Sequence, residues 1–219
     1  MHTCDTGAVP ARRILVQGHR GARGVRPENT LEAFAYAVAA GADAIELDMV
    51  VTRDNAMVIS HDPVDDSGAG LPSLDDVFEL LAPAAIELNL EAKPFADTER
   101  FVRLLLDRIA AHGLASRVMV SSFDFRILDA MRAHAPEIRR GALYESVPGE
   151  IPPVHFVAPH YLLVSAERVR EAHDARMQVI PWTVNESDDW TRMVDAGVDA
   201  IIADDPAALI AWLSDRGLR

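Results

Sequence analysis

Hydrophobic residues recur along this chain in two alternating patterns. Short apolar runs, typical of buried strands, are separated by longer segments whose apolar residues follow helical spacing. The strand-like runs cover residues 14–18, 44–51, 85–90, 118–122, 141–144, 155–158, 178–182 and 200–203. The helix-like segments cover residues 30–40, 74–81, 98–111, 126–133, 166–176, 187–195 and 206–214. The pattern therefore predicts a protein built from alternating strands and helices.

Strand–helix alternation predicts parallel strands joined by right-handed crossovers. Eight strands in 219 residues fit an α/β fold, a compact single-domain (β/α)8 TIM barrel. An open doubly wound sheet is the rival architecture, and periodicity does not separate the two. Residues 145–153 hold three prolines and a glycine, so we expect a loop in the fifth crossover. A short strand at 57–60, after a turn at 53–56, is expected to pair outside the barrel.

The composition is typical of a globular protein, with 49% hydrophobic and 25% charged residues and a formal net charge of −13. This charge argues against a nucleic-acid-binding protein, which would carry a basic patch. Residues 1–13 lack the apolar stretch of a signal peptide, and we expect a flexible tail there, followed by one domain at 14–219. No run of 18 apolar residues is present, so we expect a cytoplasmic protein without stable membrane insertion.

Two of the predicted strands carry acidic residues on one face. Alternate residues of a strand point the same way, so Glu46 and Asp48 share a face of the second run. Glu91 and Lys93 likewise project from one face at the end of the third. Buried carboxylates are costly unless they are paired or bind a metal, and their oxygens suit Mg²⁺ or Ca²⁺. The three acids therefore predict a site for one divalent cation, although Arg20 and Lys93 could instead neutralise them as ion pairs.

Two histidines follow predicted strands and are candidates for acid–base chemistry. In a parallel α/β barrel the residues after the strands line the active site, and imidazole can move protons near neutral pH. His19 follows the first strand and precedes Arg20, whose guanidinium suits a phosphate. His61 follows the short strand at 57–60. We predict that one histidine takes a proton while the other gives one, with solvated loop residues as the alternative.

The ends of the last two strands carry an aromatic residue and two acids. Trp182 is either a stacking wall of a substrate pocket or a partly buried core aromatic. Asp204 and Asp205 precede Pro206, and we expect them to cap the last helix rather than to react.

With these residues assembled, the chain resembles the glycerophosphodiester phosphodiesterase family. The resemblance rests on blocks at residues 18–21, 27–34, 41–48, 52–54, 61–63, 72–74, 91–93, 122–123, 182–185 and 197–206. It implies a TIM barrel that uses a divalent cation, Mg²⁺ or Ca²⁺, to cleave a small glycerophosphodiester into an alcohol and glycerol 3-phosphate.

The same resemblance implies a role for each candidate residue. His19 and His61 would form the acid–base pair. Glu46, Asp48 and Glu91 would bind the metal. Arg20 would hold the phosphate and Lys93 would support its charge.

The chain departs from the family in one place. Family members carry a capping insertion after the His-Asp-Pro motif, whereas only residues 64–71 separate Pro63 from Pro72 here. The loss implies a more open site and leaves the substrate's alcohol undetermined. A phospholipase D-like or C-like hydrolase of lysophospholipids is the second enzyme hypothesis, and a barrel that binds phosphate esters without turnover is the non-enzyme one. A lid supplied by a partner subunit and a homo-oligomeric state both stay open.

Overall fold

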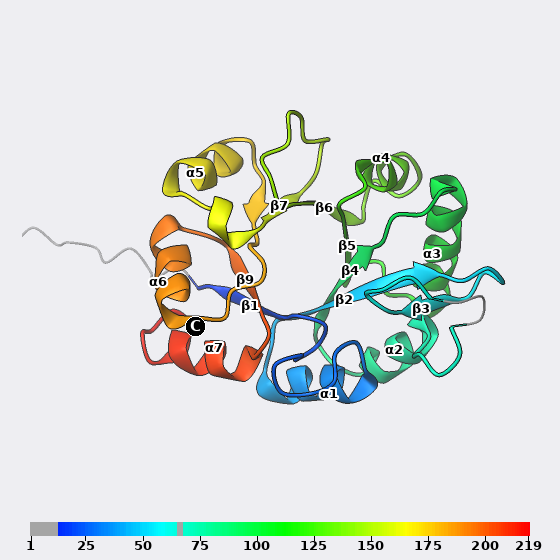
Figure 1. Ribbon diagram of the computed structural model, residues 1–219, viewed down its shortest axis with the longest axis horizontal. Coiled ribbons are helices and arrows are strands. Elements are labelled where there is room, and N and C mark those ends of the chain that lie inside the picture. Colours follow the sequence, from blue (N-terminus) through cyan, green and yellow to red (C-terminus); the bar gives the residue numbers. More distant parts are fainter. Residues whose placement is uncertain (1–12, 65–67) are drawn as a thin grey trace, which may run out of the picture.

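Parallel strands form a ring with helices around its outside in the computed structural model, which describes residues 13–64 and 68–219 (Figure 1). The ring strands are β1 (Leu15–Gly18), β2 (Ala44–Val51), β4 (Glu87–Ala92), β5 (Val118–Ser122), β6 (Arg139–Tyr144), β7 (Phe156–Pro159), β8 (Gln178–Val179) and β9 (Ala200–Ala203). This arrangement confirms the predicted TIM barrel. The tail predicted at 1–13 lies, apart from Arg13, outside the described residues.

The ring follows the order β8-β7-β6-β5-β4-β2-β1-β9, and backbone hydrogen bonds close it between its two ends. Asp199 N–H donates to the Val179 carbonyl at 3.0 Å, and Ile202 N–H donates to the Pro181 carbonyl at 3.0 Å. β8 is shorter than the predicted strand at 178–182 because Pro181 has no N–H to continue a regular ladder. Within this order the first and last strands of the chain, β1 and β9, form a parallel ladder in which Gly18 lies opposite Ala203.

Helices cover the outside of the ring where the apolar periodicity predicts them. They are α1 (Leu31–Ala40), α2 (Leu74–Leu81), α3 (Thr98–His112), α4 (Phe125–His134), α5 (Ala166–Asp174), α6 (Ser187–Ala196) and α7 (Pro206–Ser214), with a short 3₁₀ turn at Tyr161–Leu163. As predicted, a loop and no helix joins β6 to β7, between α4 and α5 (Figure 1). No helix in the described part of the chain is long and apolar enough to cross a membrane.

A hairpin extends β2 beyond the ring. β3 (Met57–Ile59) pairs antiparallel with the end of β2, which confirms the short strand expected outside the barrel. Arg100 at the start of α3 donates from Nε to Asn55 Oδ1 in the hairpin turn at 2.6 Å. The hairpin therefore carries the chain back toward the mouth of the barrel, where His61 follows β3.

The barrel interior is apolar on one side and polar on the other. The inner apolar cluster comes from β5 to β9 and comprises Met119, Leu143, Phe156, Ala158, Ile180, Ala200 and Ile202. On the other side, Asn89 Nδ2 donates to Gln17 Oε1 at 2.9 Å, and Ser121 Oγ donates to Asn89 Oδ1 at 2.9 Å. This buried polar chain lies on the side of the ring that carries the acidic strands.

One glycine of the ring is required by the packing of a neighbour. A Cβ atom at Gly141 on β6 would lie 2.0 Å from the ring of Phe156, which is fully buried on β7. Overpacking a core costs roughly 1–3 kcal/mol. We therefore expect Gly141→Ala to lower the free energy of unfolding by about 2 kcal/mol in denaturant titrations.

Gly149→Ala is the matched control for this substitution. A Cβ atom at Gly149 meets nothing within 4 Å, so the same change should move the unfolding free energy by less than about 0.5 kcal/mol. Equal effects at the two positions would show that Phe156 does not fill the space beside Gly141.

Candidate active site

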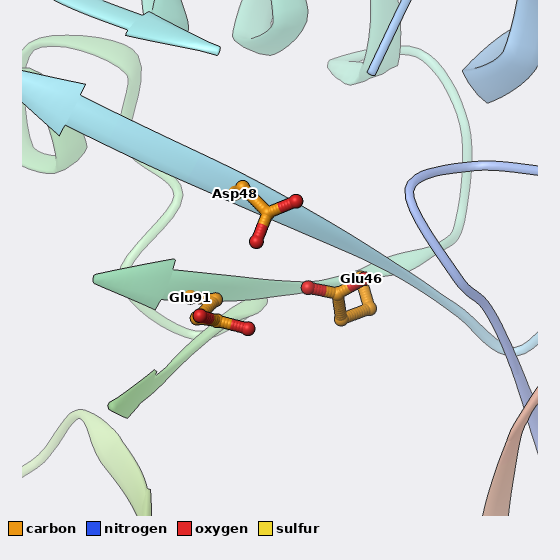
Figure 2. A group of neighbouring side chains, drawn as sticks. All are labelled: Glu46, Asp48 and Glu91. Carbon is orange, nitrogen blue, oxygen red and sulfur yellow. The ribbon is translucent and has the colours of Figure 1, made fainter. Parts of the chain in front are cut away.

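Three acidic side chains converge at the carboxyl ends of β2 and β4. The parallel register places Asp48 opposite Glu91 and Glu46 opposite Asn89. One oxygen from each of Glu46, Asp48 and Glu91 lies within 4.8 Å of the others, and all three side chains point into one space (Figure 2). Their exposed fractions are 4%, 1% and 9%. The strand alternation and the register thus bring together the acids predicted from the sequence.

Positive groups compensate two of the three acids. Lys93 Nζ lies 2.6 Å from Asp48 Oδ1 and also pairs with Glu91. Arg20 Nε lies 3.0 Å from Asp48 Oδ2, as an ion pair without hydrogen-bond alignment. Within the described residues no lysine or arginine side chain pairs with Glu46. Neutralisation by Lys93 and Arg20 therefore accounts for Asp48 and Glu91, but it leaves Glu46 without a positive partner.

Glu46 is held by a backbone group and keeps one oxygen without a partner. Its Oε2 accepts from the Arg20 backbone N–H at 2.9 Å. Its Oε1 is buried and has no hydrogen-bond partner among the described residues. A buried carboxylate oxygen without a donor is costly, and a hard divalent cation held by three carboxylates would satisfy it. The residues present therefore fit a divalent metal site.

The surroundings separate the pKa values of the three acids. Burial, together with the charges of Asp48 and Glu91, raises the pKa of Glu46 well above its usual range. Burial and the charge of Asp48 also raise the pKa of Glu91. Burial opposes ionisation of Asp48 too, but Lys93, Asn29 and Arg20 outweigh it and lower that pKa. Asp48 is thus the acid that the protein itself stabilises as an anion.

A tight turn after β1 positions Arg20. A Cβ atom at Gly18 would lie 2.0 Å from the Gly21 carbonyl oxygen, and Gly21 has φ +84°. Arg20 itself has φ 47°, which is uncommon for a residue with a side chain and is typical of functional sites. Arg20 NH1 then pairs with Glu28 Oε1 at 2.7 Å. The strained turn directs both the backbone N–H and the guanidinium of Arg20 toward the acids.

His19 is buried and oriented by an acid that the sequence analysis assigned to a cap. Its Nδ1 lies 2.6 Å from Asp204 Oδ1. A carboxylate only accepts, so Nδ1 carries the hydrogen and Nε2 is left bare, 3.9 Å from Glu46 Oε2. Burial lowers the pKa of His19, although Asp204 opposes the shift. His19 therefore presents a neutral acceptor nitrogen to the acidic site.

The capping prediction for Asp204 is wrong, and the one for Asp205 is confirmed. Asp205 accepts from the Ala208 N–H at 3.0 Å as the cap of α7. Asp204 instead pairs with His19 and is held by Asn185, which donates to its Oδ2 at 2.8 Å and accepts from its N–H at 2.9 Å. The contact follows from the barrel, in which β9 pairs with β1 and the residues after both strands become neighbours. The predicted barrel could therefore have indicated that Asp204 lies beside His19.

Asn29 is a second contributor to the site, and the sequence analysis assigned it no individual role. Thr30 is the cap of α1, and it accepts from the Ala33 N–H. Asn29 is buried with φ 57°, and its Nδ2 donates to Asp48 Oδ2 at 2.9 Å. An asparagine directly before the cap residue of a helix is the signal that the sequence carries, because asparagine tolerates the left-handed conformation.

The other predicted residues lie at the rim. The side chain of His61 is 43% exposed, and its Nδ1 lies 2.8 Å from Asp62 Oδ1. A positive charge on its ring lowers the pKa of Glu91. Trp182 donates from its ring nitrogen to the Ala158 carbonyl at 2.8 Å. Its ring also makes edge contacts with Phe123 and His160 and packs on the inner apolar cluster.

Comparison with known proteins identifies close relatives of this barrel. A model of the "Glycerophosphoryl diester phosphodiesterase family" matches residues 19–91 and 63–208. A glycerophosphodiester phosphodiesterase of Caldanaerobacter subterraneus is 31% identical over 244 positions, covering 94% of this chain and 100% of the relative. The alignment is longer than the 219 residues of this chain, so the relative has segments that this chain lacks.

Two solved structures show the same barrel. A Silicibacter pomeroyi protein assigned as a glycerophosphoryl diester phosphodiesterase superposes with a TM-score of 0.86 at 28% identity, covering 94% of this chain and 95% of that one. An Oleispira antarctica phosphodiesterase, solved with the product sn-glycerol-3-phosphate, gives a TM-score of 0.85 at 22% identity, covering 91% and 96%.

Replacing the uncompensated acid should stabilise the metal-free protein. We expect Glu46→Gln to raise the free energy of unfolding in EDTA at pH 8 by on the order of 1 kcal/mol. The folded-state pKa of Glu46 lies above its unfolded value, so its destabilising effect is absent at low pH and grows as the pH rises toward the folded pKa. The gain should therefore shrink at pH 5, as measured by denaturant titrations at both pH values.

The same variant tests where a cation binds. Millimolar Mg²⁺ or Ca²⁺ should raise the unfolding midpoint of the wild type more than that of Glu46→Gln. Glu79→Gln, an exposed position on α2, should respond like the wild type. Equal stabilisation of all three proteins would place the cation elsewhere.

Proposed function

Since the chain belongs to the glycerophosphoryl diester phosphodiesterase family, we propose that it hydrolyses glycerophosphodiesters to an alcohol and glycerol 3-phosphate at the mouth of its barrel. Family membership makes the chain a phosphoric diester hydrolase. The proposed site rests on one observation. A buried oxygen of Glu46 has no hydrogen-bond partner among the described residues, and it lies beside two further acids and the positive side chains of Arg20 and Lys93. The product bound to the Oleispira relative supports a small-molecule phosphodiester as substrate.

Glu46, Asp48 and Glu91 would hold one divalent cation, Mg²⁺ or Ca²⁺. When bound, such an ion supplies positive charge against the developing charge of a phosphoryl group. The acids are hard oxygen donors, which favours these two metals over a soft one. Lys93, Asn29 and Arg20 together lower the pKa of Asp48, which keeps its carboxylate ionised and able to bind a cation.

Arg20 and Lys93 would bind the phosphate from two sides of Asp48. Lys93 approaches Asp48 Oδ1 and Arg20 approaches Oδ2, so the two positive groups flank the same carboxylate. A guanidinium and an ammonium group both donate charge-assisted hydrogen bonds to phosphate oxygens. Trp182 would contribute an apolar contact at the rim.

His19 and His61 would transfer the protons. The bare Nε2 of His19 takes the proton of the attacking hydroxyl, from water or from the 2-hydroxyl of the substrate's glycerol. As the new oxygen–phosphorus bond forms, the bond to the alcohol oxygen breaks. His61 gives its proton to that oxygen, and the alcohol leaves neutral. Attack by water gives glycerol 3-phosphate directly. Attack by the 2-hydroxyl gives a cyclic phosphate instead; water then gives a proton to His61 and adds at phosphorus, the bond from phosphorus to the 2-oxygen breaks, and that oxygen takes the proton back from His19 to give glycerol 3-phosphate. Asp204 holds His19 in the tautomer that this role requires.

Activity should depend on the cation and on both histidines. We expect release of glycerol 3-phosphate from glycerophosphocholine with Mg²⁺ or Ca²⁺, and its loss with EDTA. His19→Ala and His61→Ala should each lower kcat by roughly 10²- to 10⁴-fold. His134→Ala is the matched control, because its side chain is also 43% exposed but pairs with Glu99 on the outside of the barrel. Undiminished turnover in the two histidine variants would contradict the acid–base assignment.

Asp204 and Asp205 allow a comparison of neighbouring positions. In Asp204→Asn an amide N–H can donate to Nδ1 of His19, which favours the tautomer with the hydrogen on Nε2 and removes the proton acceptor. We therefore expect kcat to fall roughly 10- to 100-fold with little change in KM. Asp205→Asn keeps a good helix cap and should leave kcat unchanged. A fall in stability without a fall in kcat for Asp204→Asn would reduce Asp204 to a structural residue.

A further inference from the structure

An apolar cavity adjoins the proposed catalytic residues, and the mechanism above does not use it. Its volume is about 370 Å³, near the lower end of the range of small-ligand pockets, roughly 300–1,000 Å³. Its apolar walls are Val50 and Val51 at the end of β2, Pro63 and Val64 after His61, and Pro94 and Phe95 after Lys93.

Two proposed catalytic groups line the same cavity. His61 and Lys93 both border it, and Lys93 Nζ lies 2.6 Å from Asp48 in the acidic site. A phosphodiester whose phosphate is bound by Lys93 would therefore direct one of its two ester groups into the cavity. The other ester group must leave the phosphate in another direction.

A second, more polar cavity lies on another side of His61. It measures about 240 Å³, and its lining includes Glu28, Asn29, Thr30 and Ser60. Glu28 pairs with Arg20, the second proposed phosphate ligand. Of the proposed catalytic residues, His61 alone lines both cavities. The free hydroxyls of glycerol would lose hydrogen bonds in the apolar cavity but find donors and acceptors in the polar one.

We propose that the apolar cavity binds the alcohol side of the substrate, and that the enzyme selects glycerophosphodiesters whose alcohol is an apolar alkyl or aryl group. This inference rests on the proposed function and adds the class of alcohol to it. It also agrees with the proton transfer assigned to His61, because the alcohol oxygen then leaves beside that histidine.

The walls of the cavity are held by the fold. The ring of Phe95 packs 6.1 Å from the ring of Phe101, which is fully buried on α3, and Arg100 lies over its face. Val50 and Val51 pair with Val58 and Met57 in the β2–β3 ladder. The cavity is thus formed before a ligand arrives, which reduces the entropy lost on binding.

Another apolar cavity, of about 200 Å³, lacks this link to chemistry. It lies between the β6–β7 loop and α5, with Tyr144, Val147 and Val169 in its lining. None of the proposed catalytic residues borders it. It therefore supplies a control position rather than a substrate site.

The test compares esters that all release glycerol 3-phosphate. The methyl, hexyl and choline esters of glycerol 3-phosphate are assayed for kcat/KM with the wild type. Each fully buried methylene is worth about a fourfold gain. The cavity is partly open, so we expect the hexyl ester to exceed both the methyl and the choline ester at least tenfold.

Filling the cavity should remove this preference. Val51→Phe should lower the hexyl-to-methyl ratio of kcat/KM at least fivefold. Phe95→Ser, which makes the wall polar, should lower it as well and serves as the second variant should Val51→Phe not fold. Val147→Ser in the other cavity should leave the ratio as in the wild type.

The outcomes separate this inference from the proposed function. Release from all esters at equal efficiency overturns the inference and leaves the proposed function intact, whereas no release from any ester overturns both. A preference for 1-acyl-glycerophosphocholine that Val51→Phe removes would assign the cavity to a chain on the glycerol side and overturn the inference. It is also overturned if Val51→Phe changes the oligomeric state in size-exclusion chromatography but not the ester preference.

Discussion

The burial of three carboxylates against two cationic side chains is the constraint on which the site depends. Removing an ionised carboxylate from water costs several kcal/mol, and only a charge partner or a metal repays that cost. Lys93 and Arg20 provide this compensation around Asp48, while Glu46 keeps an oxygen without a donor. The strands β2 and β4 hold this unpartnered carboxyl group in place. The fold thus maintains a locally unfavourable arrangement that a divalent cation would relieve.

Closure of the barrel adds the proton-transfer group to this charge cluster. β9 pairs with β1, so that the residues following these strands, Asp204 and His19, come into contact although they are 185 positions apart. Asp204 is fixed in turn by two hydrogen bonds with Asn185, from the segment after β8. Acids from β2 and β4 therefore meet an oriented imidazole from the end of the β1–β9 pair. Neither part requires a flexible element to bring it to the site.

The sequence predicted the parts of this structure that follow from local periodicity. Alternation within the strands put Glu46 and Asp48 on one face, and strand–helix order predicted the parallel pairing that aligns them with Glu91. The family resemblance, not the order of elements, favoured a barrel over an open sheet. Local periodicity did not predict the contact of Asp204, because that contact depends on the pairing of β1 with β9. It also began β6 at residue 141, whereas Arg139 and Arg140 belong to the strand. The buried Arg140 donates from NH1 to backbone carbonyls, among them Ile138 O at 2.7 Å, which a pattern of apolar residues does not reveal.

The short segment between Pro63 and Pro72 changes which residues can determine substrate choice. Without an inserted lid, the groups nearest the proposed acid–base pair are those on the strand ends and on the segments that follow them. On one side of His61 these groups are valines, prolines and Phe95, and on the other they include Glu28, Asn29 and Ser60. An apolar wall cannot replace the hydration of a charged or hydroxyl-rich alcohol, whereas a polar wall can replace that of glycerol. The contrast between the two walls, with the histidine between them, gives the site a means of orienting a phosphodiester that does not depend on an inserted lid.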